Sequence, residues 1–284
     1  MKNRILLILA LAFVVLGCSD RYAIEKRYWG LQKQAGDIFG NPHSTPPRQI
    51  EQVVKKFNGF ANKYPGTNLA IDADFTIARL YAAKEDFDKA REQLSAIMKK
   101  YSNSPVIVSE AMALYGNSYE MENKWGLAVN EYKKVYEKYP YSRAGFELPI
   151  YIARHYKAKF QPESMNEAYM EAVAHYKTLI QDNTDPRIAI NAYFLMTNCY
   201  MELKDWNAVV SAYDSIIKNY KDNPKAQSAV ETATLNKALI YATQLKNLPK
   251  AKEILAEFTK RYPRSRLIKV ANNLLKEIEK NAAK

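Results

Sequence analysis

The sequence is poor in the residues on which several common folds and sites depend. Among 284 residues it has 9 glycines, 2 cysteines and 3 histidines. So little glycine argues against collagen-like, linker-rich or turn-rich all-β architecture, and so few cysteines and histidines argue against a zinc module or a disulfide framework. The mean hydropathy of -0.41 excludes a polytopic membrane protein. Hydrophobic residues still make up 48% of the chain, which is enough apolar material for a mostly helical, folded body.

The chain begins with a segment of the secretory-signal type. Lys2 and Arg4 form a positive start, and residues 5–16 are apolar or small. As a helix this run rises about 18 Å, well short of a hydrocarbon core of about 30 Å, so a transmembrane anchor is the weaker interpretation. The run ends in Leu-Gly-Cys, which resembles the bacterial lipobox.

The lipobox resemblance implies that residues 1–17 are a cleaved signal peptide, that Cys18 is lipidated, as with palmitate, and that residues 18–21 form a tether. Ser19 after the cysteine resembles the pattern of lipoproteins sent to the outer membrane, on its periplasmic face. An ordinary cleaved signal with a chance cysteine is the alternative.

A short string containing tyrosine recurs along the rest of the chain. It reads KYPGT at 63–67, KYSNS at 100–104, KYPYS at 138–142, NYKDN at 219–223 and RYPRS at 261–265, with a further equivalent at 180–186. Upstream, Tyr81, Ala90, Leu94, Ile97 and Tyr101 correspond to Tyr119, Ala128, Tyr132, Val135 and Tyr139. Spacings of four, three and four place such residues on one helical face, and prolines fall between the units. Self-similarity of this length predicts stacked helical hairpins.

The second full unit resembles the tetratricopeptide repeat. Its Gly116, Tyr119, Ala128, Tyr132 and Pro140 stand at the family's small, aromatic, small, aromatic and proline positions. The long repeats and the YPxS-like junction further resemble the BamD-like outer-membrane lipoproteins. The resemblance implies an all-α, right-handed α-solenoid.

We expect six hairpins, at roughly 22–64, 68–103, 105–141, 144–182, 186–222 and 225–263, followed by a capping helix from about Arg264 to Lys280. Residues 22–284 would then form a single domain. We expect three irregular places: an insertion between Lys159 and Tyr169, a proline-rich loop from Asn41 to Pro47, and Pro149, which should delay or kink its helix.

The sequence offers no constellation for catalysis. His43, His155 and His175 lie far apart, without an acid or a cysteine at the spacing of a triad or a metal motif, and no glycine-rich phosphate loop is present. Cys199 precedes a tyrosine of the repeat and is interpreted as a small buried hydrophobic residue. We therefore expect no enzyme activity, no catalytic residue, no metal and no cofactor.

The resemblance also indicates where a ligand would bind, because the first helix of each tetratricopeptide hairpin lines a concave groove. The residues two positions before the tyrosine of that helix are Arg79, Asn117, Arg154, Asn198 and Leu239. The four polar ones are candidates for holding an extended peptide or a carboxylate, and the alternative is a solvated helix face. The residues six positions before the tyrosine are either core or an exposed apolar strip: Phe75, Ala113, Ile150, Phe194 and Leu235.

The function that follows is a lipid-anchored periplasmic scaffold that binds protein or extended peptide partners during assembly of the cell envelope or of outer-membrane proteins, as the BamD-like resemblance implies. Two alternatives stay open: a pilotin or secretion-system accessory, and a regulatory subunit that positions an envelope enzyme. The net charge of +12 is interpreted as solvated helix faces or as attraction to anionic lipid or an acidic partner. Export argues against a nucleic-acid ligand.

Overall fold

A computed structural model describes residues 2–182 and 185–282, with side chains for 21–182 and 185–280. This part of the chain contains thirteen α-helices, one short 3-10 helix and no strand, which confirms the all-α prediction. The chain divides into two compact units, Met1–Val135 and Tyr136–Lys284, with the boundary inside one helix. Where side chains are described, none of the helices combines the length and apolar character required to cross a membrane.

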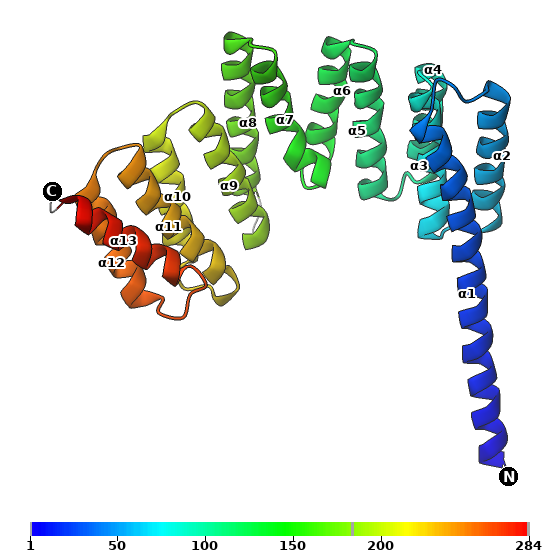
Figure 1. The fold of residues 1–284 in the computed structure, drawn as a ribbon, viewed down its shortest axis with the longest axis horizontal. Coiled ribbons are helices and arrows are strands. Elements are labelled where there is room, and N and C mark those ends of the chain that lie inside the picture. Colours follow the sequence, from blue (N-terminus) through cyan, green and yellow to red (C-terminus); the bar gives the residue numbers. More distant parts are fainter. Residues whose placement is uncertain (1, 183–184, 283–284) are drawn as a thin grey trace. The chain divides into compact units, whose positions relative to one another are not determined.

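The helices pair into successive hairpins (Figure 1). The first unit comprises α1 (Lys2–Gly40), α2 (Pro47–Lys63), α3 (Asn68–Ala83), α4 (Phe87–Lys100), α5 (Pro105–Met121) and most of α6 (Trp125–Lys138). The second comprises α7 (Arg143–Ala158), α8 (Pro162–Asp182), α9 (Pro186–Glu202), α10 (Trp206–Tyr220), η1 (Pro224–Ala226), α11 (Gln227–Thr243), α12 (Leu248–Arg261) and α13 (Ile268–Ala282). Within each unit the hairpins expected from the repeat are confirmed.

The repeat positions form the core of each hairpin. The small position of the second helix is fully or almost fully buried throughout, at Ala90, Ala128, Ala172, Val209 and Ala251. The next two positions along the same face are buried as well, as Leu94 and Ile97 in α4 and as Tyr176 and Leu179 in α8. The four-three-four spacing therefore marks the face that each second helix turns toward its neighbours.

A recurring turn joins the two helices of a hairpin. In the five hairpins from α3 onward, a residue shortly after the first helix adopts a left-handed backbone although it is not glycine: Glu85, Asn123, Phe160, Lys204 and Lys246, with φ between 53° and 64°. The following amide donates to the carbonyl of the repeat tyrosine, as from Asp86 to Tyr81 at 2.9 Å and from Lys124 to Tyr119 at 2.8 Å. This bond caps the helix C-terminus, which explains why the chain makes these turns with so little glycine.

The tyrosine strings form the junction between hairpins. In four of them the last residue donates its amide to the tyrosine carbonyl at 2.8 to 3.0 Å: Ser104, Ser142, Asn223 and Ser265. Thr67 and Ser142 then cap the next helix, because their hydroxyls accept from the amides of Ala70 and Gly145 at 3.1 and 3.0 Å. At these two junctions the string is thus a turn followed by an N-cap.

The insertion and Pro149, two of the three expected irregularities, are accommodated mainly within helices. The insertion between Lys159 and Tyr169 lengthens α8 to 21 residues, against 14 in α4, so it adds helix and not loop. Pro149 lies inside α7, which begins at Arg143, so the proline does not delay the start of this helix. Because proline lacks an amide proton, the carbonyl of Gly145 loses its helical donor, and the His175 ring nitrogen lies 3.2 Å from that oxygen.

The capping helix starts later than predicted. α13 begins at Ile268 instead of Arg264, because the Ser265 side chain accepts from the amide of Leu267 at 3.1 Å and donates to Glu231 at 2.7 Å, which holds residues 264–267 in a turn. Ala271 and Ile278 of α13 are buried against α11 and α12, as a cap requires. The single domain over 22–284 and the handedness of the array stay predictions, since each unit is described by itself.

Gly116 lies where α5 and α6 approach closely. A Cβ atom there would lie 2.7 Å from Cε1 of Tyr132, whose ring is buried and whose hydroxyl donates to Glu120 at 2.8 Å. We expect Gly116→Ala to destabilise the protein by about 1 to 3 kcal/mol, because this overpacking outweighs a gain in helix propensity of about 1 kcal/mol. Chemical denaturation measures the change.

Gly59→Ala in α2 is the control, because nothing lies within 4 Å of its new Cβ and only the propensity gain of about 1 kcal/mol applies. Equal stabilisation by both substitutions would show that α5 and α6 do not approach this closely.

Candidate functional site

Two of the four predicted groove residues line one hollow in the first unit. Arg79 of α3 and Asn117 of α5 stand on its wall, and its volume is about 280 Å³. The remaining lining residues are mostly apolar and come from α1, α3, α4 and α5: Phe39, Ala78, Ala82, Ala83, Ala90, Leu94, Leu114, Ser118 and Met121. We call this site the α3–α5 hollow. Its apolar wall and polar edge match the usual composition of a binding site.

Arg79 is held at the edge of the hollow by polar contacts on α3. Its Nη2 donates to Asp72 Oδ1 at 2.9 Å and to Thr76 Oγ1 at 3.0 Å, and about half of its side chain is exposed. Asp72 also accepts from Tyr28 and, at 3.1 Å, from Gln32. Burial and then Asp72 raise the pKa of Tyr28, so the phenol stays neutral. The guanidinium of Arg79 has further N–H groups besides those that bond Asp72 and Thr76, and these can face a ligand.

A buried arginine fixes the opposite wall. Arg91 of α4 is 8% exposed and bonds Ser118 of the hollow at 3.2 Å, Asp88 at 2.6 Å and Glu122. Its guanidinium also lies over the Tyr119 ring, 4.5 Å from the centroid. Lys124 first, and Arg91 after it, lower the pKa of Glu122 against the opposing effect of burial. These bonds attach α4 to the end of α5 and so set the width of the hollow.

The other two predicted residues belong to the second unit. Arg154 of α7 is exposed, and Asn198 of α9 is half-buried. The charge of Arg154 acts to lower the pKa of Tyr169 and Cys199, but burial is the larger effect and raises each to about 12. Cys199 is fully buried, which confirms its interpretation as a core residue. A binding role for Arg154 and Asn198, and a single line of four residues, stay predictions.

The structure also shows which of the residues six positions before the tyrosine belong to the core. Phe75, Ile150 and Leu235 are buried and belong to the core, whereas Ala113 and Phe194 are half-buried. The apolar wall of the α3–α5 hollow comes instead from the repeat residues Ala90 and Leu94 and from residues that the sequence did not single out. Ala83 and Met121 follow Arg79 and Asn117 by four residues, so helical spacing could have found them. Phe39 arrives from α1, and no periodicity connects it to the repeats.

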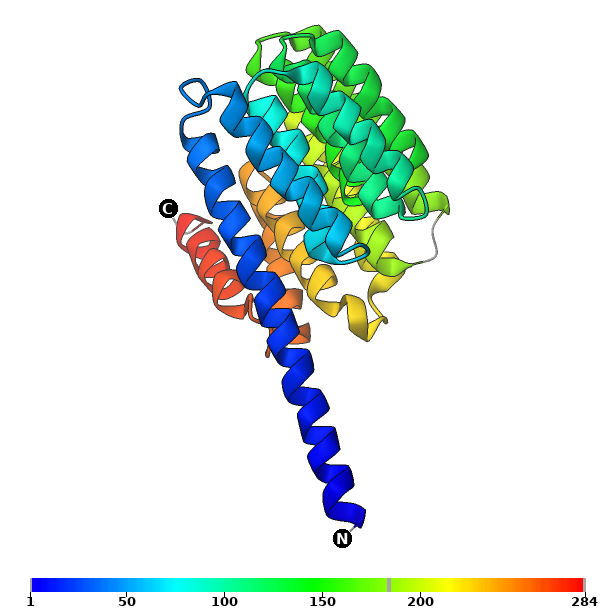
Figure 2. The ribbon, with the colours of Figure 1, turned by 90° about the vertical axis from the view of Figure 1, so that its right-hand side faces the viewer.

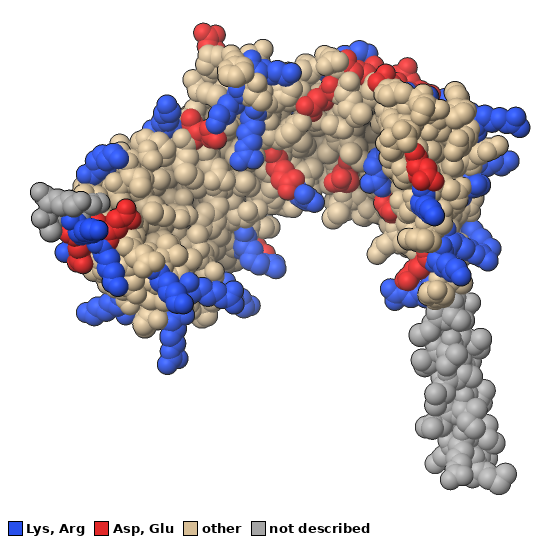
Figure 3. Space-filling model, viewed as in Figure 1, with Lys and Arg blue, Asp and Glu red and all other residues tan. Residues whose placement is uncertain are grey.

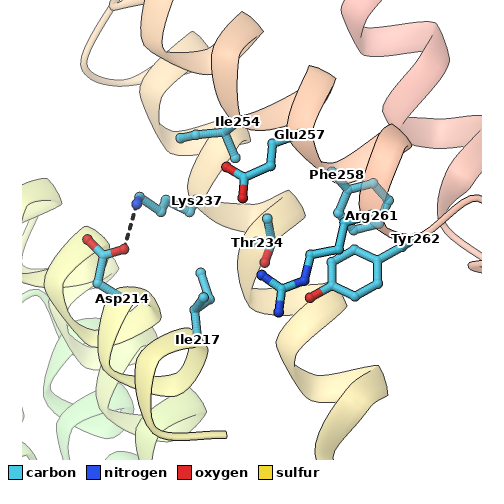
Figure 4. Close-up of a pocket in the computed structure, with 9 residues that line it drawn as sticks. All are labelled: Asp214, Ile217, Thr234, Lys237, Ile254, Glu257, Phe258, Arg261 and Tyr262. Carbon is cyan, nitrogen blue, oxygen red and sulfur yellow. Dashed lines mark hydrogen bonds and ion pairs between the residues drawn. The ribbon is translucent and has the colours of Figure 1, made fainter. Parts of the chain in front are cut away.

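A second, smaller hollow of about 100 Å³ lies between α10, α11 and α12 (Figure 4). Lys237 pairs with Asp214 at 2.5 Å, while Glu257 and Arg261 also line the opening. The two basic and two acidic side chains of this hollow balance in charge, so it has no net charge with which to select an ionic ligand. The larger α3–α5 hollow is therefore the stronger candidate site.

The chemistry available at the α3–α5 hollow is recognition. An arginine and an amide can donate to carbonyl or carboxylate oxygens, and the apolar wall can take an aliphatic or aromatic side chain. In the described part of the chain, no group of three or more His, Cys, Asp or Glu side chains could hold a metal ion. The predicted lipidation site Cys18, with residues 1–17, lies outside the residues whose side chains are described.

The two arginines of this site should differ sharply in their effect on stability. Arg91→Ala would remove one of the two cations that pair with Glu122, together with a buried guanidinium that also bonds Ser118, so we expect a loss of about 2 to 4 kcal/mol in the free energy of unfolding. Arg79→Ala removes a half-exposed ion pair and should cost at most about 1 kcal/mol. Urea denaturation compares them, and an equal loss would contradict the assigned roles.

Comparison with known proteins identifies the repeat. Residues 72–104, 191–223 and 232–265 match the family model described as tetratricopeptide repeat. Each matched segment ends at the last residue of a tyrosine string: Ser104, Asn223 and Ser265. The comparison with curated proteins found no match.

Among solved structures, the chain is similar to BtubC from P. vanneervenii, at 12% identity and a TM-score of 0.41, over 84% of this chain and 90% of that one. It is also similar to the TPR2AB domain of yeast Sti1 in complex with pHSP90, at 13% identity and a TM-score of 0.35, over 90% and 99%.

A third similar structure is the C-terminal part of a TPR repeat-containing protein from Cytophaga hutchinsonii, at 15% identity and a TM-score of 0.41, over 81% and 79%. Likenesses this loose carry no conclusion about partner or activity. The family-model matches show that the chain contains tetratricopeptide repeats built on its α3–α4, α9–α10 and α11–α12 hairpins.

Proposed function

We propose that the chain is a non-catalytic, lipid-anchored scaffold that binds a protein partner during assembly of the cell envelope. The α3–α5 hollow takes one apolar side chain of an extended partner segment, and Arg79 and Asn117 hold the oxygen atoms beside it. The anchor places the scaffold on the periplasmic face of the outer membrane. This role agrees with the BamD-like resemblance of the sequence.

The observation that carries the proposal is the composition of the α3–α5 hollow. Phe39 and Met121 are 39% and 47% exposed, so the hollow opens to solvent with apolar surface that a bound side chain would remove from water. Arg79 stands next to that surface with its orientation already fixed by Asp72. A preorganised donor beside an apolar recess favours a peptide over a solvated ion.

Site-directed crosslinking identifies the partner. A photoactivatable amino acid at Met121, inside the hollow, should capture an envelope protein in living cells. The same amino acid at Leu127 is the matched control, because Leu127 is 48% exposed, belongs to the same unit and does not line the hollow. Capture from Leu127 and not from Met121 would contradict the proposed site.

Arg79→Ala should weaken binding of the captured segment by roughly tenfold or more, because a hydrogen bond to a charged group contributes about 1.5 to 3 kcal/mol. Calorimetry with the purified segment measures the change. Arg187→Ala is the matched control, since Arg187 pairs with Asp185 at 2.8 Å much as Arg79 pairs with Asp72. If both variants bound the segment with equal affinity, the hollow would not be the recognition site.

Cys18→Ala should release the chain from the membrane, because the lipid that holds it would be missing. Incorporation of labelled fatty acid and fractionation of cells measure the two effects. A wild-type chain that takes up no fatty acid, or a variant that stays processed and membrane-bound, would refute the anchor.

A further inference from the structure

The outer face of α1 carries aromatic and basic residues that are largely exposed to solvent. Tyr22 and Trp29 are 66% and 68% exposed, and Lys26 and Lys33 are exposed between and after them. At 100° per residue these four side chains fall within about 60° of arc and span about 16 Å of helix. We call them the α1 stripe.

The α1 stripe lies opposite the face that packs into the unit. Tyr28, Ala35 and Ile38 are buried against α2 and α3, and Ile24 and Leu31 pack beside them. Arg27 donates to the Tyr64 hydroxyl at 2.8 Å, and Tyr28 donates to Asp72, so the rotation of α1 about its axis is fixed. Figure 2 shows the later half of α1 alongside α2. The stripe therefore faces away from its own unit.

The charge of the stripe selects the kind of surface it fits. In the described part of the chain, neither Lys26 nor Lys33 pairs with a carboxylate, whereas the neighbouring Arg21 is paired with Glu25 at 3.0 Å. Figure 3 shows lysine and arginine side chains, with some aspartate and glutamate among them, where the described part of α1 begins. Two free cations interleaved with tyrosine and tryptophan suit an interface of apolar and anionic groups.

We propose that the α1 stripe binds the headgroup region of a membrane that contains anionic lipid, so that α1 lies along the membrane surface. The inference rests on the proposed lipid anchor for proximity, because Cys18 precedes Tyr22 by four residues, or about 6 Å of helix. Tyr22 and Trp29 insert their rings at the level of the headgroups, and the lysine ammonium groups contact lipid phosphates.

The test uses the full chain, as the cell processes it, reconstituted into vesicles. One set contains phosphatidylcholine alone and another also contains phosphatidylglycerol, each with and without bromine on the acyl chains near the headgroup. The chain has three tryptophans, so the difference between wild type and Trp29→Phe isolates the emission of Trp29. Flotation of the vesicles reports the anchor separately.

We expect brominated lipid to quench Trp29 in vesicles with phosphatidylglycerol, and the quenching to be lost in the Lys26→Glu, Lys33→Glu double variant. Lys269→Glu with Lys276→Glu is the matched control, because these exposed lysines of α13 have the same spacing of seven residues. The control pair should quench like the wild type.

Three results would overturn the inference. A chain that floats with the vesicles while Trp29 is not quenched has its anchor but no lipid contact at the stripe. A Trp29 that is shielded from aqueous iodide yet untouched by brominated lipid is covered by protein, such as a second copy of the chain. A chain that does not float refutes the anchor and the stripe together.

Discussion

Close approach of the two helices in each hairpin is the constraint on which the rest of the structure depends. It is met by one small residue in the second helix, as Ala90, Ala128, Ala172 and Ala251 are all buried almost without exposure. Because each hairpin is narrow at this point, the larger residues on the same face can reach the neighbouring helices and build the core within each unit. In the third hairpin the first helix also has a small residue, because Gly116 of α5 lies against the ring of Tyr132 of α6.

The sequence predicted the fold well because its repeat is local. The four-three-four spacing and the tyrosine strings identify helix, turn and cap within about 40 residues, which is the length of one tetratricopeptide-like unit. What it missed depends on side-chain contacts between residues 30 or more positions apart in the sequence. Nothing local shows that His175 of α8 would supply a partner for the carbonyl that Pro149 leaves free in α7, or that Ser265 would bond Glu231 and delay α13.

The candidate site was predicted only in part, for the same reason. Arg79 and Asn117 were found by counting from a repeat tyrosine, and they do share a hollow. Phe39, which completes its apolar wall, comes from α1, where the repeat pattern is absent, and Arg91, which holds the opposite wall, occupies a position that a surface helix would fill with any polar residue. The hollow is thus a product of how α1, α4 and α5 meet α3.

The central claim is that the partner segment enters the α3–α5 hollow, and amide hydrogen exchange tests it most directly. Exchange is measured on the full chain with and without the captured segment. The account predicts slower exchange in the last turns of α3 and α5, at residues 79–83 and 117–121, where Arg79, Asn117 and Met121 line the hollow. Slower exchange confined to α7–α13, with α3 and α5 unchanged, would contradict it.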